Sequence, residues 1–382
     1  MNLFLKRVFV VCCFIFLSSC AAHLQNDVLP SGICSANAKY EGSEKQGSPA
    51  FPTLPKDRLN INRRMPAGLS DKLSLVFNET IQKTKATAGS VTIWDPKSGY
   101  WAASKGPDTA DRYWVASTGK MITSSVILQM VSEGKLSLKS KLSEWFPEFP
   151  NAELITLDHL LSHTSGIYSF NSDEQFRKEK GYKSPARLLA IARKHKPLFC
   201  PGTRWNYSNT GYILLGLIAE KTDGAPLSVI VKRRIAIPLN LKSLKVVQAN
   251  DSSSLFVKSA LRPAPTARDV STVYGAGGMI INNRDLLVFL HSYMGGKVVS
   301  LKTSLQPLFN MFQGPMYYGR GVMVVKVPDR KKPTIWVGHS GGSPATKSIA
   351  FYDVKRKVYI TISLNINGPA EAMANSLLKV LD

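Results

Sequence analysis

Strand-like stretches occur at both ends of this chain, and a long block of helical or irregular character separates them. Near the N-terminus, two runs at 90–94 and 100–104 flank a turn that contains Pro and Gly. Residues 70–85 and 369–381 have the spacing of helices that bury one face. Four more strand-like runs, joined by polar turns, follow one another near the C-terminus: 321–327, 334–337, 348–352 and 358–364. This order predicts an α+β fold, in which terminal helices flank one antiparallel sheet and a mainly helical subdomain is inserted.

Ser117 and Lys120 stand where a strongly apolar helical run begins, and Gly134 predicts where that run ends. Positions i and i+3 share a helix face, so the hydroxyl and the amine can meet. An uncharged lysine in a dry pocket can take the proton of a serine hydroxyl, but its pKa must then fall from about 10.4 toward neutrality, which costs roughly 4 kcal/mol. Taken alone, the pair fits a helix N-cap beside a solvated lysine better than a catalytic pair.

The composition limits the classes of partner. The chain has 382 residues, 44% of them apolar and 20% charged, which predicts a globular protein with a sizeable core. Its formal charge of +23 favours contact with anionic surfaces such as acidic lipid headgroups, lipopolysaccharide or an acidic cell-wall polymer. Lys and Arg are nevertheless scattered, and no basic arm or nucleic-acid-binding motif occurs. We therefore expect no nucleic-acid partner.

The first residues have the pattern of an export signal. The basic pair Lys6-Arg7 precedes an apolar run at 8–17 that is too short to span a bilayer. The run ends in a sequence that resembles the bacterial lipobox, so we expect a lipoprotein signal peptide over 1–19 and a lipid on Cys20. Ordinary signal-peptidase cleavage at 21–23 is the alternative.

The mature protein is then expected to be anchored to a membrane by lipid and to face the periplasm. Ala21, rather than Asp, follows the lipidated cysteine, which by the rule for such lipoproteins favours the outer membrane. Residues 20–65 are rich in Gly, Ser, Pro and Asn and predict a flexible tether, and residues 66–382 predict the folded domain.

Cys34 and Cys200 are the cysteines that remain beyond Cys20. In an oxidising compartment they can form a disulfide, and two free thiols are the alternative.

Five short motifs form a set along the chain. They are Ser117-x-x-Lys120, Ser-His-Thr-Ser-Gly within 160–166, Tyr207-x-Asn209, the glycine-rich stretch 275–279, and His339-Ser340-Gly341. Together they resemble the serine β-lactamase and penicillin-binding-protein-like family, and within it the class C enzymes, the D,D-carboxypeptidases and related esterases. The resemblance extends from about residue 70 to the C-terminus. It implies a β-lactamase/transpeptidase-like fold with the site in the cleft between the sheet and the helical subdomain.

The resemblance also implies roles for the motif residues. Ser117 would be the acylated nucleophile, and Lys120 would activate it. Tyr207 would pass a proton to the leaving group and later activate water. Asn209 would hydrogen-bond to Lys120 and to the amide carbonyl of the substrate.

The His339-Ser340-Gly341 motif would bind substrate from an edge strand. His339, Ser340 and Gly341 would line the site, and the backbone N–H groups of Gly342 and Ser117 would stabilise the oxyanion. The β-lactamases of the family usually carry lysine where this chain has His339. Because histidine is charged only part of the time near neutral pH, the resemblance favours a peptidase or an esterase over a β-lactamase.

We therefore expect a serine hydrolase that forms an acyl-enzyme on Ser117 and acts in the cell envelope. The first choice is a D,D-carboxypeptidase or D-amino-acid peptide amidase. Association with peptidoglycan belongs to this expectation. The alternatives are a carboxylesterase, a class C-like β-lactamase, and a non-catalytic lipoprotein that binds the wall or penicillin. No cofactor is expected. No metal is expected either, because His159 and His163 lack the intervening acid of a zinc motif, and His163 fits a structural hydrogen-bonding role.

Overall fold

The computed structural model describes residues 34, 35, 38–42, 55, 57–108, 110–179, 181–312, 314–328 and 333–382. The expected signal peptide 1–19 and the expected lipid site Cys20 lie outside these residues. Among the helices within the described ranges, none is long and apolar enough to cross a membrane.

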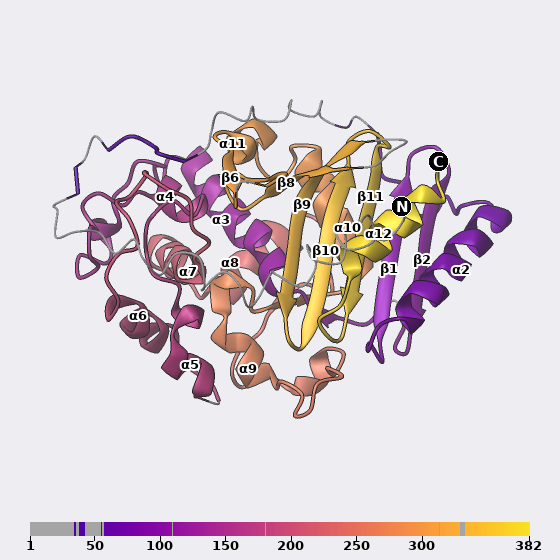
Figure 1. Cartoon of the computed structure of the whole chain (residues 1–382), viewed down its shortest axis with the longest axis horizontal. Helices are drawn as coiled ribbons and strands as arrows, with labels where there is room; N and C mark the ends of the chain where they lie inside the picture. The colour runs from indigo at the N-terminus through magenta and orange to yellow at the C-terminus, as the bar shows by residue number, and fades with distance from the viewer. Residues whose placement is uncertain are drawn as a thin grey trace, which may run out of the picture.

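An eight-stranded antiparallel sheet joins strands from both ends of the chain, as the sequence predicts (Figure 1). The N-terminal strand β1 pairs with the C-terminal strand β11 in a register that sets Gly89 opposite Leu364. The sequence does not predict the two short strands β6 and β7 at one end of the sheet. In spatial order the strands are β2 (Gly99–Lys105), β1 (Gly89–Asp95), β11 (Val358–Leu364), β10 (Thr346–Asp353), β9 (Thr334–Ser343), β8 (Met323–Val327), β7 (Met316–Tyr318) and β6 (Phe309–Met311).

Helices cover both faces of this sheet. α2 (Ala67–Gln82) and α12 (Ala370–Lys379) pack against each other on one face, and α10 (Asn283–Met294) packs on the other, against β1, β10 and β11 (Figure 1). Every residue of β1 and β11 is buried, which is why these strands are not alternately polar and apolar. α2 begins three residues before the predicted start at Ser70, directly after Pro66.

Most of the block between the two sets of strands, α10 excepted, forms the helical subdomain, at the left of Figure 1. α3 (Lys120–Ser132) lies within it and is buried on nearly all sides, as its apolar composition predicts. The other elements are α4 (Leu157–Leu161), α5 (Glu174–Lys178), α6 (Pro185–Arg193), α7 (Asn209–Asp223), α8 (Leu227–Val231), α9 (Ala267–Thr272), α11 (Leu301–Leu305), and a small sheet of β3 (Tyr113–Trp114), β5 (Met279–Ile281) and β4 (Lys245–Val246).

Part of the segment predicted as a tether contacts the domain. Cys34 and Cys200 form a disulfide, so the segment is joined covalently to the loop that precedes α7. Close by, the backbone N–H of Glu41 donates to the carbonyl oxygen of Thr203 at 2.7 Å. Residues 63–65 lie beside β2, where a parallel bridge joins Arg64 to Tyr100, and the carbonyl oxygen of Asp57 lies 2.9 Å from Nε2 of His291 on α10. The described residues before α2 therefore pack on the folded domain.

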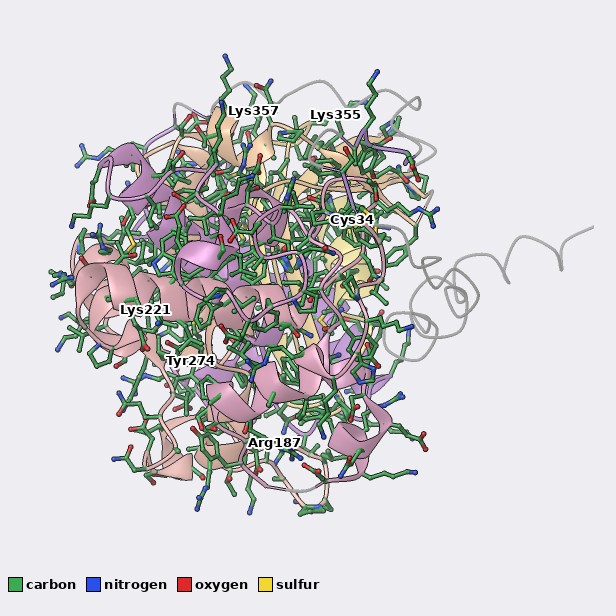
Figure 2. The ribbon with its side chains drawn as sticks, turned by 90° about the vertical axis from the view of Figure 1, so that its left-hand side faces the viewer. Cys34, Arg187, Lys221, Tyr274, Lys355 and Lys357 are labelled. Carbon is green, nitrogen blue, oxygen red and sulfur yellow. A yellow bond between two sulfur atoms is a disulfide. The ribbon has the colours of Figure 1, made fainter. Side chains whose placement is uncertain are left out.

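Surface lysines are distributed over separate elements. Figure 2 shows Lys355 and Lys357 extending from the turn between β10 and β11, where both are exposed. Lys221 lies on α7, in the helical subdomain, and is exposed as well. This distribution agrees with the scattered charge of the sequence, and attraction to an anionic surface stays a prediction.

Candidate active site

Ser117 lies on a short turn between β3 and α3. The turn is a 3₁₀ helix, η1 (Ala116–Gly119), and the α-helix expected to start near Ser117 begins at Lys120. Ala116 has φ +45°, a left-handed conformation that costs a non-glycine residue energy and is frequent at functional sites. Gly277 backs the turn: a Cβ on Gly277 would lie 2.3 Å from the carbonyl oxygen of Ala116. The glycine-rich stretch thus permits a close backbone approach behind Ser117.

Lys120 is fully buried, and its Nζ has three neighbours. Nζ lies 3.1 Å from Ser117 Oγ, 2.6 Å from Asn209 Oδ1 and 2.6 Å from the carbonyl oxygen of Ala276. Burial holds the pKa of Lys120 well below its usual range, because desolvation disfavours the charged amine. A neutral amine donates two hydrogen bonds, and the two carbonyl oxygens accept both. The lone pair is then left for the hydroxyl of Ser117, the arrangement that a general base requires.

The Tyr-x-Asn motif lies where α7 starts. α7 begins at Asn209, three residues before its predicted start at Tyr212, and Asn209 makes the expected contact with Lys120. The ring centroid of Tyr207 lies 4.9 Å from Lys120 Nζ. The roles that the resemblance assigns to Tyr207 and Asn209 in proton transfer and substrate binding stay predictions.

His163 supports this motif. Its Nδ1 accepts a hydrogen bond of 3.2 Å from the backbone N–H of Ser208, and its ring lies 4.1 Å from that of Tyr207. Burial holds the pKa of His163 well below its usual value, so the ring is neutral. His159 has a different role, in the N-terminal cap of α4, where its Nδ1 accepts a hydrogen bond from the backbone N–H of Thr156. Within the described ranges, no group of three possible metal ligands occurs.

The His339-Ser340-Gly341 motif lies on β9 and approaches η1. A Cβ on Gly341 would lie 2.1 Å from the carbonyl oxygen of Val115, so this glycine permits the approach. β9 is not an edge strand of the sheet, contrary to the expectation. Within the part of the chain that the structure describes, however, β8 pairs with β9 only up to Gly338. Residues from His339 to Gly342 therefore follow the point where β9 loses one neighbour, and the oxyanion role of Gly342 stays a prediction.

His339 is buried, with both ring nitrogens engaged. Nδ1 lies 2.6 Å from the carbonyl oxygen of Ser340, which only accepts, so Nδ1 carries the proton. Nε2 therefore accepts from the hydroxyl of Tyr318, at 3.0 Å. Burial, followed by the proximity of Lys120, lowers the pKa of His339 from 6.5 to about 3. The expectation of a partly charged histidine is wrong, because desolvation keeps the ring neutral near pH 7.

Three further residues belong to the site and were missed in the sequence. Tyr318, on β7, holds His339. Ser169 and Asn171 lie on the loop after α4 and hydrogen-bond to Asn209. No motif or periodicity marks any of the three, since each is recruited by long-range packing.

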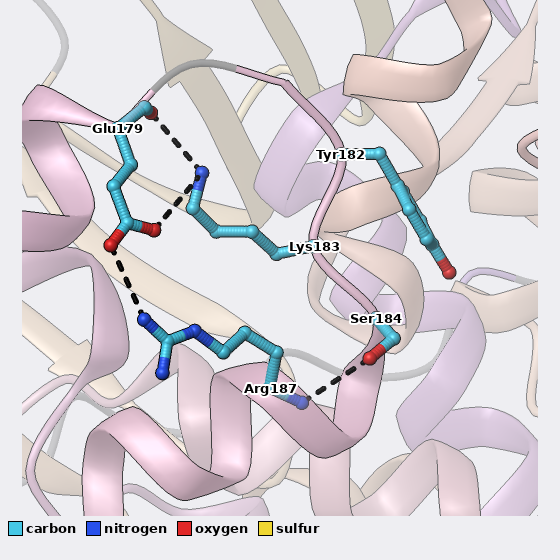
Figure 3. A pocket seen from close by; sticks show the side chains of 5 residues that line it. All are labelled: Glu179, Tyr182, Lys183, Ser184 and Arg187. Atoms are coloured by element: carbon cyan, nitrogen blue, oxygen red, sulfur yellow. Dashed lines mark hydrogen bonds and ion pairs between the residues drawn. The ribbon is translucent and has the colours of Figure 1, made fainter.

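A surface depression of about 600 Å³ lies elsewhere in the helical subdomain. Figure 3 shows the Glu179 carboxylate between Lys183 and Arg187, at 3.8 and 3.2 Å. The depression is lined by Glu179, Tyr182, Lys183, Ser184 and Arg187. None of these residues belongs to the candidate site. The opposite charges pair with each other, so the depression has the character of a structural ion-pair cluster.

Comparisons with known proteins agree with this geometry. The sequence profile of the Beta-lactamase family matches residues 77–381. The chain is 26% identical over 196 residues to a putative penicillin-binding protein, PbpX, of Bacillus subtilis, covering 50% of this chain and 48% of that one. It is 28% identical over 214 residues to esterase EstB of Burkholderia gladioli, covering 48% and 53%. The matches thus span about half the length of these curated relatives.

A solved structure matches over a longer range. The crystal structure of a D-stereospecific amidohydrolase from Streptomyces sp. superimposes with a TM-score of 0.71 at 26% identity, covering 80% of this chain and 98% of that one.

Proposed function

Since the chain belongs to the Beta-lactamase family and is a serine hydrolase of that family, we propose that it forms an acyl-enzyme on Ser117 and cleaves amides of D-amino acids or D-peptides. The observation that carries the proposal is the environment of Lys120, whose two carbonyl partners leave its lone pair facing Ser117 Oγ at 3.1 Å. That arrangement supplies a base for a nucleophile that is otherwise weak.

The proposed reaction has two halves. In acylation, the Ser117 hydroxyl transfers its proton to Lys120 Nζ while Oγ bonds to the substrate carbonyl carbon. The C–N bond then breaks, and the departing amine takes a proton from Tyr207, which regains one from Lys120. In deacylation, water gives a proton to the same pair while its oxygen adds to the ester carbonyl carbon. The C–Oγ bond then breaks and Oγ takes that proton back, which releases the carboxylic acid and restores the Ser117 hydroxyl.

The hydrogen bonds of His339 favour a substrate that the site does not hold by a carboxylate. Its Nδ1 donates to Ser340 and its Nε2 accepts from Tyr318, so neither nitrogen is available to a substrate anion. A lysine at this place would supply a permanent cation, and this chain lacks it. The site therefore fits a neutral amide better than a β-lactam or a peptide that must be held by its terminal carboxylate. The preference for the D configuration is taken from the name of the similar Streptomyces amidohydrolase.

A carboxylesterase is the second candidate. The chain resembles an esterase over about half its length, and a neutral His339 places no charge requirement on the leaving group. An ester is also easier to cleave than an amide, because an alkoxide leaves without the proton that an amine needs.

The proposal places the enzyme in the cell envelope. The lipobox-like sequence before Cys20 supports lipid anchoring at a membrane that faces the periplasm, and the charge of +23 supports association with an acidic wall or lipid surface. Labelling of the full chain with radioactive palmitate, compared with Cys20→Ala, tests the anchor. Incorporation that persists in Cys20→Ala would contradict it.

Turnover of a small substrate panel tests the chemistry. The panel contains D- and L-alanine p-nitroanilide, p-nitrophenyl acetate, a chromogenic cephalosporin, and a D-alanyl-D-alanine-type peptide with a free or an amidated C-terminus. We expect the D-anilide to be cleaved faster than its L form, and the amidated peptide faster than the free acid. Turnover of the ester without any D-amide would favour the esterase, and a preference for the free acid would favour the D,D-carboxypeptidase. Ser117→Ala is the matched control for every substrate.

A further inference from the structure

We propose that Asn171, together with Ser169, is a positioning residue that sets the orientation of the Asn209 side-chain amide and thereby directs the lone pair of Lys120 at Ser117. The inference rests on the proposed function of Ser117 and Lys120. Neither Asn171 nor Ser169 touches Lys120 in the hydrogen bonds given above, so both act through Asn209.

Three hydrogen bonds form a closed ring around Asn209. The backbone N–H of Asn209 donates to Ser169 Oγ at 2.9 Å, and Ser169 Oγ lies 2.7 Å from Asn171 Oδ1. The Nδ2 group of Asn209 donates to the same Oδ1 at 2.8 Å. Because Ser169 Oγ already accepts, its own proton goes to Asn171. The atom of Asn171 in the ring is therefore an acceptor for two donors.

This ring fixes the Asn209 amide. An amide end that faces an acceptor must be its NH₂, so the oxygen of Asn209 is forced to the other side, toward Lys120 Nζ at 2.6 Å. With Asn171 removed, the amide can rotate by 180° and present its NH₂ to Lys120. The lone pair of the neutral lysine would then accept from Asn209 instead of the Ser117 hydroxyl, and the base would be lost to the nucleophile.

The loop that carries the two residues is itself anchored to α7. The Thr210 hydroxyl donates to the carbonyl oxygen of Tyr168 at 2.8 Å and accepts from the backbone N–H of Phe170 at 3.0 Å. These bonds span the two sides of Ser169, so the ring is built on a supported loop rather than on an exposed one.

Several titratable side chains surround Lys120, and three of them carry no charge near neutral pH. The rings of Tyr207 and Tyr212 lie 4.9 and 5.4 Å from Nζ, and burial raises the pKa of Tyr212. His163 and His339 interact with Lys120 electrostatically, and burial lowers the pKa of each. His163, Tyr212 and His339 are thus uncharged near neutral pH. A carboxylate introduced at position 171 would therefore act on the pKa of Lys120 with few other charges nearby.

Two variants of the full chain test the proposal, with Ser172→Ala, on the same turn, as the matched control. Asn171→Leu removes the acceptor at similar volume, and Asn171→Asp keeps the acceptor but adds a negative charge. The readout is the rate at which a fluorophosphonate probe phosphonylates Ser117, with loss of fluoride, between pH 5 and 10. Urea unfolding of each variant checks that it is folded.

We expect Ser117 of Asn171→Leu to be phosphonylated about 10- to 100-fold more slowly than that of the wild type at pH 7, in the range of one lost catalytic positioning contact. We expect Asn171→Asp to retain more of the rate at high pH, with the acid limb of the profile moved to higher pH, because a nearby carboxylate favours the charged lysine. Ser172→Ala should match the wild type. A wild-type profile in Asn171→Leu, or an equal loss in both variants without any shift of the limb, would overturn the proposal.

A second measurement does not depend on catalysis. The Asn209 side-chain NH₂ resonance, assigned by its absence in Asn209→Asp, should exchange slowly with solvent in the wild type and in Asn171→Asp, and quickly in Asn171→Leu. Equal exchange in all three would overturn the positioning role. If the probe does not modify Ser117 in the wild type, the proposed function fails, and this measurement still decides whether Asn171 orients Asn209.

Discussion

The hydroxyl of Tyr318 donates a hydrogen bond of 3.0 Å to Nε2 of His339. The bond connects β7, near the end of the sheet, to β9, the strand that carries His339-Ser340-Gly341. It satisfies a buried ring nitrogen without charging it, and it takes from His339 the atom that could have held a substrate anion. The proposed preference for a neutral substrate thus depends on a tyrosine that no motif marks.

The low pKa of His339 predicts acid sensitivity. The folded protein keeps His339 neutral down to about pH 3, whereas the unfolded chain protonates it near 6.5. Below pH 6.5 the unfolded chain therefore binds the extra proton, and the free energy of unfolding falls as pH falls, by about 1.4 kcal/mol per pH unit from this group. Urea unfolding at pH 4, 5, 6 and 7 measures the slope. His339→Gln should be shallower by that amount, and identical slopes would contradict the assignment.

Loss of the Tyr318 hydroxyl should destabilise the protein. Tyr318→Phe leaves Nε2 of His339 buried without a donor, at a cost of about 1 to 3 kcal/mol. Tyr113→Phe is the matched control, because the buried Tyr113 hydroxyl has no hydrogen-bond partner among the described residues. Its removal should be neutral or stabilising. Urea midpoints of both variants check this, and equal losses would argue against a specific Tyr318–His339 bond.

Gly277 should be essential for the turn that presents Ser117. A Cβ at this position would lie 2.3 Å from the backbone oxygen of Ala116, and φ is +142°. We expect Gly277→Ala to cost about 3 kcal/mol or more and to slow acylation, because either the turn or the glycine-rich stretch must move. Gly68→Ala is the control: it lies on α2 with nothing within 4 Å of its added Cβ, and it should stabilise by up to about 1 kcal/mol. Unchanged stability in Gly277→Ala would contradict the close approach.

The disulfide should contribute to stability through the long loop it closes. Cys34 and Cys200 are 166 residues apart, which corresponds to as much as about 5 kcal/mol in the chain-entropy account. Reduction of the wild type should lower the urea midpoint toward that of Cys34→Ser, and a reductant should not change Cys34→Ser. A wild-type midpoint that does not respond to the reductant would show that the bridge carries no stability.

Local patterns in the sequence predicted the fold well. The runs that became β1, β2 and β8 to β11 have strand composition, and the helix that became α3 is apolar throughout. The contact of Lys120 with Ser117 was expected from their i, i+3 spacing, and its contact with Asn209 was implied by the family resemblance.

What the sequence did not predict depends on burial and on distant neighbours. Desolvation is the largest influence on the charge of His339, and Nε2 of its ring is held by Tyr318, which comes from a strand too short to recognise. Asn171 and Ser169 join the site because the loop after α4 folds onto α7, and no periodic pattern encodes that contact. β9 was expected at an edge, but β6, β7 and β8 extend the sheet beyond it.

Intact-protein mass spectrometry after reaction with a fluorophosphonate probe tests the central claim, an acyl-accepting Ser117 activated by Lys120, most directly. The wild type should gain the mass of one probe adduct, with peptide mapping to Ser117. Ser117→Ala should gain none, and Lys120→Met should react at least about a thousand-fold more slowly. An adduct that persists in Ser117→Ala, or a wild-type protein that stays unmodified, would contradict the account.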